Sequence, residues 1–399
     1  MNNPVVIVSA ARTPIGAMLG RLSTLQGHQL GALALRAALE RAGIAPEKIQ
    51  EVLMGCVLPA GQGQAPARQA MVGAGIPMSA GATTLNKVCG SGMKAAMLAH
   101  DLLVAGSQDI VLAGGMESMS NAPYLLPRAR TGYRFGHALM LDHMAYDGLE
   151  DAYDKLPQGG GRSMGTYAED CAAHFSFSRE AQDAYAIESS RRARLANEDG
   201  SFDWEITPVS VAQRDGEQRV ANDESPFRVK PEKIPSLKPA FRADGTVTAA
   251  TSSSISDGAA ALLLMRRDTA RELGLTPLAR IVGHATHAQE PRWFTTAPIG
   301  AINRLCERIG WQPGGVDLYE INEAFAVVAM AANRELGLDA ARVNVHGGAV
   351  ALGHPIGASG ARLIVTLLGA LRKRGGGRGI ASLCIGGGEA TAIAVELEN

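Results

Sequence analysis

The sequence predicts an α/β protein built from two similar halves, and three observations lead to that fold class. Apolar segments typical of buried strands alternate with segments typical of helices, which indicates βα units in mixed or parallel sheets. Short motifs of the first half recur in the second at an almost constant spacing. The segment between the halves differs from both in composition, so we expect it to be an insertion.

The first half opens with Val5–Val8, which we expect to be a buried strand. A helix over 30–43 and a strand over 51–54 follow. The next helix, 90–105, is apolar over much of its circumference, as a helix buried between two sheets should be. It leads to an apolar strand over 109–113, which would need a covering partner if it lay at a sheet edge.

The second half repeats this order with a helix over 299–310, a strand over 317–321, a helix over 359–371 and a strand over 379–385. Each of these strands and helices of the second half therefore has a counterpart in the first half. This correspondence predicts two domains of the same architecture.

Two sequence matches support a duplication. Glu40-Arg41-Ala42-Gly43 recurs 267 residues later as Glu307-Arg308-Ile309-Gly310, and Ser91-Gly92 recurs 268 residues later as Ser359-Gly360. The alternative is coincidence, because Glu-Arg-x-Gly ends many helices. Two separate matches with nearly the same offset favour the duplication.

Tyr, Pro, Arg and Asp become more frequent in the segment between the halves. We expect an inserted loop domain there that carries substrate contacts, with a helix over 178–197 that starts at the N-cap Ser178. The predicted domains are an N-terminal half over 1–118 completed by 249–270, the inserted loop domain over 119–248, and a C-terminal half over 271–399.

Composition argues against several classes of function. The 38 Lys and Arg residues balance 39 Asp and Glu, so no net charge attracts nucleic acid or a membrane surface. The five cysteines form no C-x-x-C pair, which fits a reducing compartment better than a disulfide framework. No run reaches the ~18 apolar residues of a membrane span, and the N-terminus lacks the features of a signal peptide. We therefore expect a cytoplasmic protein.

Cys89 stands among small residues in Asn86-Lys87-Val88-Cys89-Gly90-Ser91-Gly92, where the helix over 90–105 begins. The N–H groups and the dipole of a helix start favour the thiolate, which is the reactive form of a nucleophilic cysteine. The alternative is a buried and inert cysteine, the usual state of a free thiol.

Two runs far downstream offer partners for this cysteine. His354 lies in the glycine-rich turn Gly353-His354-Pro355, where an imidazole with a near-neutral pKa can take a proton from a thiol. Cys384 ends an apolar strand before Gly386-Gly387-Gly388. Alone, His354 could simply bond loop backbone and Cys384 could be a small core residue. Together with Cys89 they are suited to acyl transfer through a thioester.

These runs, with Asn322-Glu323-Ala324-Phe325, the opening run Ala10–Gly16 and Val343-Asn344-Val345, resemble the motifs of the thiolase family across essentially the whole chain. The resemblance implies a thiolase-like fold. This fold has two duplicated α/β domains with mixed five-stranded sheets, packed helix against helix, and a loop domain inserted in the first.

The resemblance also implies a role for each residue of the site. Cys89 would carry the acyl group, His354 would be its base, and Cys384 would exchange the α-proton of a second acetyl-CoA. The N–H groups of Gly386 and Cys89 would form one oxyanion hole. Asn322 would hold a water that forms a second one with His354, although Asn322 could instead cap a helix.

The implied ligand contacts are less specific. Ser253 would touch the pantetheine arm of coenzyme A, and Arg228 would contact its nucleotide. Met164, Phe241 and Phe325 would wall the acyl pocket, with ordinary core packing as an equal alternative for each of these three.

Two departures from the family pattern bear on specificity. Ser163 precedes Met164, where acetoacetyl-forming members often carry His, and His346 stands where many members have Asn. His284 and His287 form an H-x-x-H pair, but strand alternation places them on opposite faces. We therefore expect no metal there, and the sequence offers no other ligand cluster.

The resemblance implies an acyltransferase that reversibly condenses two acetyl-CoA into acetoacetyl-CoA and CoA, with ping-pong kinetics through Cys89. Coenzyme A would be a substrate and product, no cofactor is expected, and the family suggests a homo-oligomer, a dimer of dimers. One alternative is a 3-ketoacyl-CoA thiolase of broader chain length that serves fatty-acid β-oxidation. Two others are a non-catalytic acyl-CoA-binding relative and a cysteine hydrolase. Nothing in the sequence resembles the strand-turn-helix elbow of such hydrolases.

Overall fold

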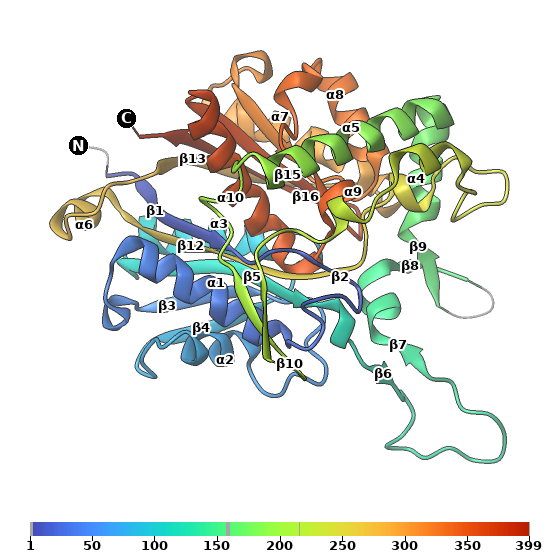
Figure 1. Cartoon of the computed structure of the whole chain (residues 1–399), viewed down its shortest axis with the longest axis horizontal. Helices are drawn as coiled ribbons and strands as arrows, with labels where there is room; N and C mark the ends of the chain where they lie inside the picture. Colours follow the sequence, from blue (N-terminus) through green and yellow to red (C-terminus); the bar gives the residue numbers. More distant parts are fainter. Residues whose placement is uncertain (1–2, 157–159, 215, 399) are drawn as a thin grey trace.

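The computed structural model describes residues 3–156, 160–214 and 216–398. Figure 1 shows most of the first half in blue and cyan, with β12 and α6 (residues 256–272) in yellow, and the second half in orange and red. The insertion, mainly green, lies at the right and across the front. The first half consists of β1 (Val5–Arg12), β2 (Gly16–Ala17), α1 (Gly27–Ala42), β3 (Glu51–Gly55), α2 (Pro66–Gly73), β4 (Gly81–Leu85), α3 (Ser91–Ala105), β5 (Ile110–Ser118), β12 (Ser256–Arg266) and α6 (Arg267–Glu272).

The second half and the insertion complete the chain. The second half consists of β13 (Ala279–Ala288), α7 (Ala297–Ile309), β14 (Leu318–Ile321), α8 (Ala326–Leu336), α9 (Ala349–Leu352), α10 (Ile356–Arg374), β15 (Arg378–Ile385) and β16 (Glu389–Leu397). The insertion holds β6 (Tyr124–Leu125), β7 (Leu141–Asp142), β8 (Glu150–Lys155), β9 (Gly161–Ser163), α4 (Met164–His174), α5 (Arg179–Glu198), β10 (Val209–Gln213) and β11 (Gly216–Val220).

The strands of both halves join into one mixed sheet. Its order is β14-β15-β16-β13-β1-β12-β5-β3-β4, with β2 beside β12, and the halves meet through a short antiparallel pairing of β1 and β13. The first half contributes the five strands implied by the family resemblance. The second contributes four, and its fifth position is reduced to a single parallel bridge between Tyr319 and Val343. The duplicated α/β fold is confirmed.

One expectation about the sheet is wrong. The strand expected over 109–113 is β5, and it lies between β12 and β3 rather than at an edge. The two outermost strands of the order are β4 and β14. Apolar composition marks a strand covered on both faces, and it carries no information on whether the strand is also paired on both sides.

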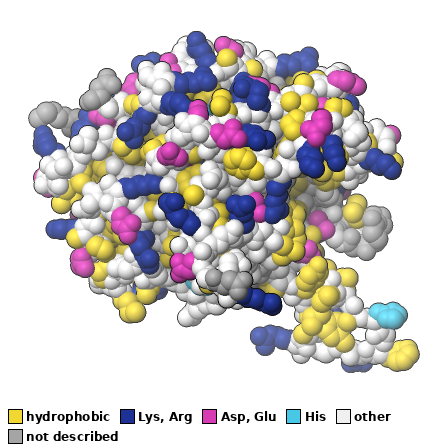
Figure 2. Space-filling model, in the orientation of Figure 1, with side chains coloured by type: hydrophobic (Ala, Val, Ile, Leu, Met, Phe, Trp, Pro, Cys, Tyr) yellow, Lys and Arg dark blue, Asp and Glu magenta, His cyan; other side chains and the backbone are white. Residues whose placement is uncertain are grey.

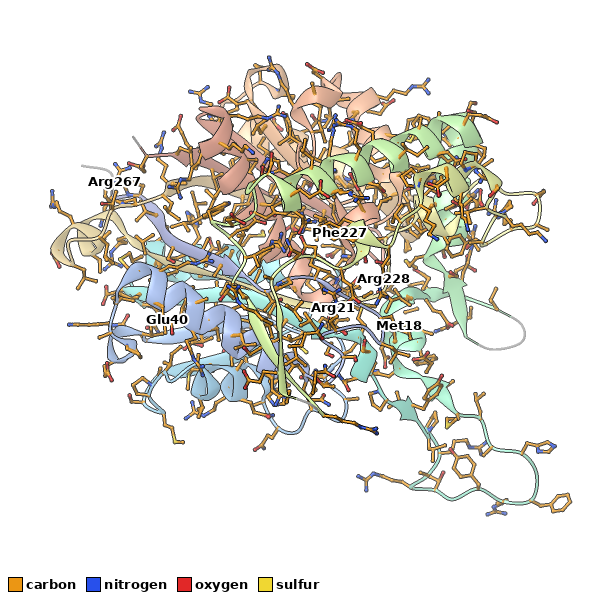
Figure 3. All side chains as sticks on the ribbon, viewed as in Figure 1. Met18, Arg21, Glu40, Phe227, Arg228 and Arg267 are labelled. Carbon is orange, nitrogen blue, oxygen red and sulfur yellow. The ribbon has the colours of Figure 1, made fainter. Side chains whose placement is uncertain are left out.

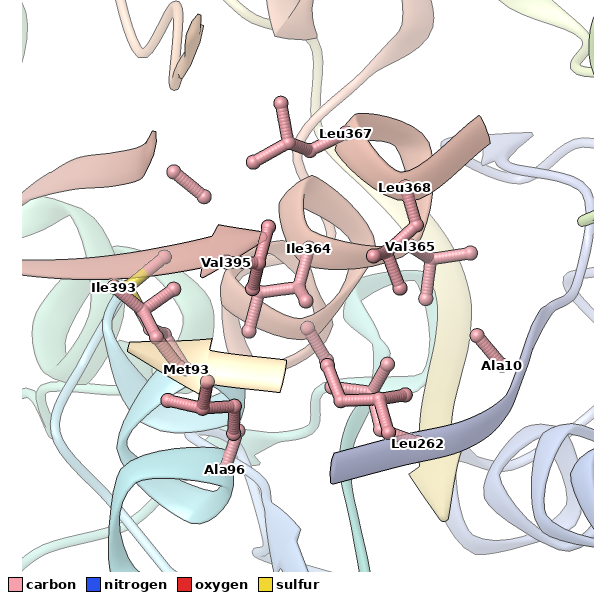
Figure 4. Close-up of a cluster of buried hydrophobic side chains, with 14 of the residues drawn as sticks. Ala10, Met93, Ala96, Leu262, Ile364, Val365, Leu367, Leu368, Ile393 and Val395 are labelled. Atoms are coloured by element: carbon pink, nitrogen blue, oxygen red, sulfur yellow. The ribbon is translucent and has the colours of Figure 1, made fainter. Parts of the chain in front are cut away.

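Helices cover the sheet in layers. The helices α3 and α10 lie between the two halves of the sheet, whereas α1 and α2 cover the outside of the first half and α7 and α8 the outside of the second. This layering explains the apolar circumference of α3. Figure 4 shows the central cluster, to which α3 contributes Met93 and Ala96, α10 contributes Ile364, Val365, Leu367 and Leu368, and the strands contribute Ala10, Leu262, Ile393 and Val395.

The duplicated motifs occupy equivalent places. Gly43 and Gly310 end α1 and α7 with φ values of 64° and 72°, in the left-handed region that glycine adopts without steric cost. Gly92 and Gly360 lie where α3 and α10 cross. A Cβ on Gly92 would lie 2.8 Å from the backbone nitrogen of Ala361, and one on Gly360 would collide with the backbone of Met93.

The insertion agrees with its predicted helix, since α5 begins at Arg179 and the N-cap Ser178 accepts a 3.2 Å hydrogen bond from the Ala181 N–H. Within the described residues, no helix combines the length and the apolar character required to cross a membrane.

The helix crossing gives a stability prediction. Gly360→Ala should lower the free energy of unfolding by about 3 kcal/mol or more, because the clash is with backbone and overpacking typically costs ~1–3 kcal/mol even where side chains can move. Gly314→Ala is the matched control, since an added Cβ there meets nothing within 4 Å. Urea unfolding of both variants would measure the difference, and equal stabilities would contradict a tight crossing.

Candidate active site

Cys89 lies in the turn between β4 and α3. The preceding residue, Val88, has φ 45°, a conformation that β-branched residues rarely adopt. Two side chains hold the turn. Asn86 Oδ1 accepts from the Val88 N–H at 2.8 Å, and Ser91 Oγ accepts from the Lys87 N–H at 2.8 Å while donating to the Val88 carbonyl at 2.6 Å. Strain held in place by such contacts is typical of functional sites.

This segment corrects one expectation. The strand β4, the strained turn and α3 together form a strand-turn-helix elbow with Cys89 at its tip. Sequence inspection found no such elbow because the strained position is occupied by Val88, and valine gives no indication of a positive φ.

The electrostatic surroundings of Cys89 also differ from expectation. Burial raises the pKa of its thiol to about 11, and the buried carboxylate of Glu117 adds to the rise. The backbone N–H groups of Gly386 and of Cys89 itself hydrogen-bond the sulfur and act in the opposite direction. These N–H groups favour the thiolate as predicted, but burial outweighs them and keeps the pKa of the thiol above its ordinary value.

His354 follows α9 and is buried. Its Nδ1 lies 2.6 Å from Ser359 Oγ, and that hydroxyl donates its proton to the Pro355 carbonyl at 2.9 Å. Ser359 must therefore accept from Nδ1–H, which leaves Nε2 unprotonated. Burial, with a smaller effect from Arg362, lowers the pKa of His354 to about 3 rather than leaving it near neutral.

Asn322 follows β14, and its side chain is fully buried beside His354. Its Nδ2 lies 3.5 Å from His354 Nε2, and its Oδ1 has no hydrogen-bond partner among the described residues. The helix-cap alternative is wrong, because α8 begins only at Ala326 and its N-cap is Phe325. Asn322 thus presents an unpaired polar group next to the imidazole.

Cys384 is near the end of β15 and fully buried. Burial raises its pKa well above the ordinary thiol value, and the nearby charge of Cys89 adds to this shift. Cys384 packs in one apolar cluster with residues of the insertion and of α8, among them Met164, Phe241 and Phe325.

A cavity of about 230 Å³ opens in front of these groups. The structure brings most of the predicted residues to its wall, and Ser163 is there too. Phe241 and Phe325 meet edge to face with their ring centroids 5.8 Å apart. The lining residues are Cys89, Gly148, Leu149, Ser163, Met164, Gly165, Phe241, Ser252, Ser253, Ile255, Phe294, Ala324, Phe325, His354, Ile356 and Gly386.

A second cavity, of about 460 Å³, adjoins the first through shared walls at Ser252 and Ile255. Arg228 lines it and forms an ion pair with Glu224. Figure 3 shows Met18, Arg21, Phe227 and Arg228 close together on this side of the molecule. The two cavities form a small chamber and an adjoining wider one, and the lining of the wider cavity includes the cationic side chain of Arg228.

The sequence analysis missed two residues that hold the site together. Ser359, noted only as a repeat, fixes the tautomer of His354. Glu117 accepts from the N–H groups of Val57, Leu58 and Gly357, at 2.9, 3.1 and 2.9 Å, and burial raises its pKa to about 7. An acidic residue at the end of an otherwise apolar strand was the available signal for Glu117.

His346, one of the two departures from the family pattern, does not line the cavity that Cys89 lines. Its ring packs edge to face on Phe202 at 5.6 Å, and burial lowers its pKa to about 4. Among the residues that the structure describes, no hydrogen bond or ring contact joins His346 to Cys89 or His354.

Comparison with known proteins shows which family has this sequence and fold. Residues 5–268 match the family model described as the thiolase N-terminal domain, and residues 275–397 match the thiolase C-terminal domain. Acetyl-CoA acetyltransferase 2 of Arabidopsis thaliana is 51% identical over 396 residues, which are 98% of this chain and 97% of that protein. The acetyl-CoA acetyltransferase of Cupriavidus necator is 48% identical over 394 residues, 98% of this chain and 99% of its own.

Two solved structures are similar over the whole chain. The crystal structure of the Acat5 thiolase from Ascaris suum, in complex with coenzyme A, has a TM-score of 0.92 at 42% identity and covers 99% of this chain and 100% of its own. The acetyl-CoA acetyltransferase from Syntrophomonas wolfei has a TM-score of 0.95 at 38% identity, with 100% of both chains covered.

The buried imidazole predicts a pH dependence of stability. His354 has a folded pKa of about 3 against 6.5 for the free side chain, so between these values the unfolded chain binds a proton that the native chain does not. The free energy of unfolding therefore falls by about 1.4 kcal/mol per pH unit as the pH drops from 6.5 toward 3, and it does not depend on this group above pH 6.5.

Urea unfolding at several pH values below 6.5 would test this, with His354→Gln expected to show a shallower loss than the unmodified protein. His137→Gln, in an exposed loop, should keep the original slope. Identical slopes in all three proteins would contradict a neutral buried His354.

Proposed function

The chain belongs to the thiolase family, and from this premise we propose that it is an acetyl-CoA C-acetyltransferase that condenses two acetyl-CoA into acetoacetyl-CoA and CoA, and runs the reverse thiolysis. The observation that carries the proposal is the convergence of Cys89, His354 and Gly386 on one small cavity. The names of the relatives, which are about half identical over their full length, support the choice of acetyl-CoA.

In the first half-reaction, His354 Nε2 takes the Cys89 proton as the sulfur attacks the acetyl carbonyl. The N–H groups of Gly386 and Cys89 stabilise the oxyanion. CoA then leaves with the proton from the imidazolium, and Cys89 carries the acetyl group as a thioester. The unprotonated Nε2 and the N–H groups that already bond the sulfur support these roles.

In the second half-reaction, Cys384 takes an α-proton from a second acetyl-CoA. The resulting enolate oxygen is stabilised by a water held on Asn322, and by His354 only when its Nε2 carries a proton. The enolate carbon attacks the thioester carbonyl and the bond to the Cys89 sulfur breaks, so acetoacetyl-CoA forms. Cys384, which acts as a thiolate in taking the α-proton, passes that proton to the released Cys89 thiolate. The unpaired Oδ1 of Asn322 supports this assignment, as does the packing of Cys384 in one cluster with the cavity residues Met164, Phe241 and Phe325.

Coenzyme A enters through the wider cavity. We assign Ser253 to the pantetheine arm, because it lies on the wall of the small cavity beside Ser252, which lines both cavities. Arg228 is assigned to the nucleotide, because its guanidinium is more than half exposed at the wide mouth. Met164, Phe241 and Phe325 surround the acyl group.

The acyl chain should be short. A cavity of about 230 Å³ must hold both the acyl group and the end of the pantetheine arm, whereas pockets for drug-sized ligands occupy roughly 300–1,000 Å³. The broader 3-ketoacyl-CoA thiolase of fatty-acid degradation remains the alternative. All residues of the proposed mechanism are present, so a non-catalytic binding protein is disfavoured.

Chain-length profiling tests the specificity. Thiolysis rates with 3-ketoacyl-CoA substrates of increasing length should be highest for acetoacetyl-CoA and fall steeply beyond it, because Phe241, Phe294 and Phe325 close the cavity. Replacing Phe294 with Ala should relax this preference by enlarging the chamber. A profile that rises with chain length would favour the 3-ketoacyl-CoA alternative.

The division of labour between the cysteines gives a second test. With Cys384→Ala, acetyl-CoA alone should still acetylate Cys89, detectable by mass spectrometry, and should still exchange with free CoA. Condensation should fall by the ~10²–10⁴ that a positioned acid–base group supplies. His354→Ala should impair both half-reactions. Equal losses of exchange and condensation in Cys384→Ala would contradict these roles, and acetylation of another cysteine would exclude Cys89 as nucleophile.

We also propose that the protein works as a cytoplasmic homo-oligomer, a dimer of dimers, in fatty-acid metabolism. Support for an oligomer comes from the edge strand β4 and from the loop between β6 and β7, which protrudes with apolar side chains at its surface in Figure 2. The exposed residues of this loop and its flanks are Tyr124, Leu126, Tyr133, Phe135, Leu139 and Met140.

Light scattering should therefore give a mass of four chains of 41.6 kDa. Replacing Leu126, Phe135 and Leu139 together with Ser should reduce the assembly size, because their apolar surface no longer favours burial. A stable monomer of the unmodified chain at micromolar concentration would overturn this proposal.

A further inference from the structure

One group of ligand-type side chains lies outside the active site. His100 and Asp101, in the last turns of α3, meet His284 of β13, and one donor atom from each lies within 4.8 Å of the other two. Asp101 Oδ1 is 2.9 Å from His284 Nε2 and 3.2 Å from His100 Nδ1. The two imidazole rings meet at 88° with their centroids 5.0 Å apart.

This group differs from the H-x-x-H pair seen in the sequence. As strand alternation predicts, His287 points away from His284. Its Nε2 lies 2.9 Å from Gln289 Oε1, and its ring packs on Gly300 of α7. The partners of His284 instead come from a helix 183 residues away in sequence, which no local pattern reveals.

We propose that His100, Asp101 and His284 form a binding site for a divalent transition-metal ion, with Zn²⁺ as the best match. Two imidazole nitrogens and one carboxylate oxygen are the donors that zinc prefers, whereas Mg²⁺ and Ca²⁺ favour all-oxygen sites. Three ligands leave one tetrahedral position for water. The half-exposed side chain of Asp101 keeps that side open to solvent, while His100 and His284 are largely buried.

Two cationic side chains lie near these three residues and would oppose a bound cation. Lys94 is on the same helix as His100, and Arg308 donates a 2.9 Å hydrogen bond to the His284 carbonyl.

The ligands are also held on rigid elements of both halves of the duplicated fold. His284 is paired with Ile393 of β16, and His100 and Asp101 belong to the helix that starts at the Cys89 turn. Small rotations would bring the donors to the roughly 2.0–2.2 Å that zinc requires. A bound ion would cross-link α3 to β13 and so stabilise the placement of that helix.

Calorimetric titration of the full-length protein, first stripped with a chelator, tests the site. We expect one Zn²⁺ equivalent per chain. The variants His100→Ala, His284→Ala and Asp101→Asn should each bind at least ~10-fold more weakly, since even indirect ligand contacts are worth ~10–100-fold. His287→Ala is the matched control and should bind as the unmodified protein does. Lys94→Gln should bind more tightly, because it removes a repelling charge.

Cobalt absorption separates this site from the cysteines. Co²⁺ should give tetrahedral bands without the sulfur charge-transfer absorption that Cys89 would add. Absence of Zn²⁺ binding would overturn the proposal, and would leave the three side chains as a hydrogen-bonded link between α3 and β13. Unchanged affinity in both His284→Ala and Asp101→Asn, or loss of binding in a folded His287→Ala, would also overturn it. None of these outcomes depends on the acyltransferase activity.

Discussion

The crossing of α3 and α10 fixes the relative position of the two loops on which the chemistry depends. Cys89 lies just before Gly92 and His354 just before Gly360, and these two glycines let the helix backbones approach without side chains between them. Any residue with a Cβ would separate the helices and with them the thiol and the imidazole. The close packing of α3 on α10, where the two halves of the duplicated fold meet, therefore also determines where Cys89 lies relative to His354.

The burial that results from this packing also determines the proton chemistry. It raises the pKa of Cys89 to about 11 and lowers that of His354 to about 3, so the resting pair is a neutral thiol beside a neutral imidazole. The N–H groups of Gly386 and Cys89 lower the pKa of the thiol, so they stabilise negative charge that develops on the sulfur.

The parts of the fold that depend on local pattern could be predicted from sequence, and those that depend on distant contacts could not. Helix ends such as Gly43 and Gly310 follow from a backbone preference. The pKa of His354 depends on burial by the whole core, and the internal place of β5 depends on strand order, which local periodicity does not encode. The domain boundaries and the roles of individual site residues stay predictions.

The duplication accounts for one more feature of the site. Ser91 and Ser359 are equivalent residues in the first turns of the two central helices, and each donates its hydroxyl proton to a carbonyl of the turn before it. Each hydroxyl also accepts one bond, Ser91 from the Lys87 N–H and Ser359 from His354 Nδ1–H. The same local contact thus holds the strained Cys89 turn in one half and sets the tautomer of His354 in the other. Because the same serine contact holds both the Cys89 turn and His354, a single ancestral half that carried this serine could already position a residue in the turn before the helix.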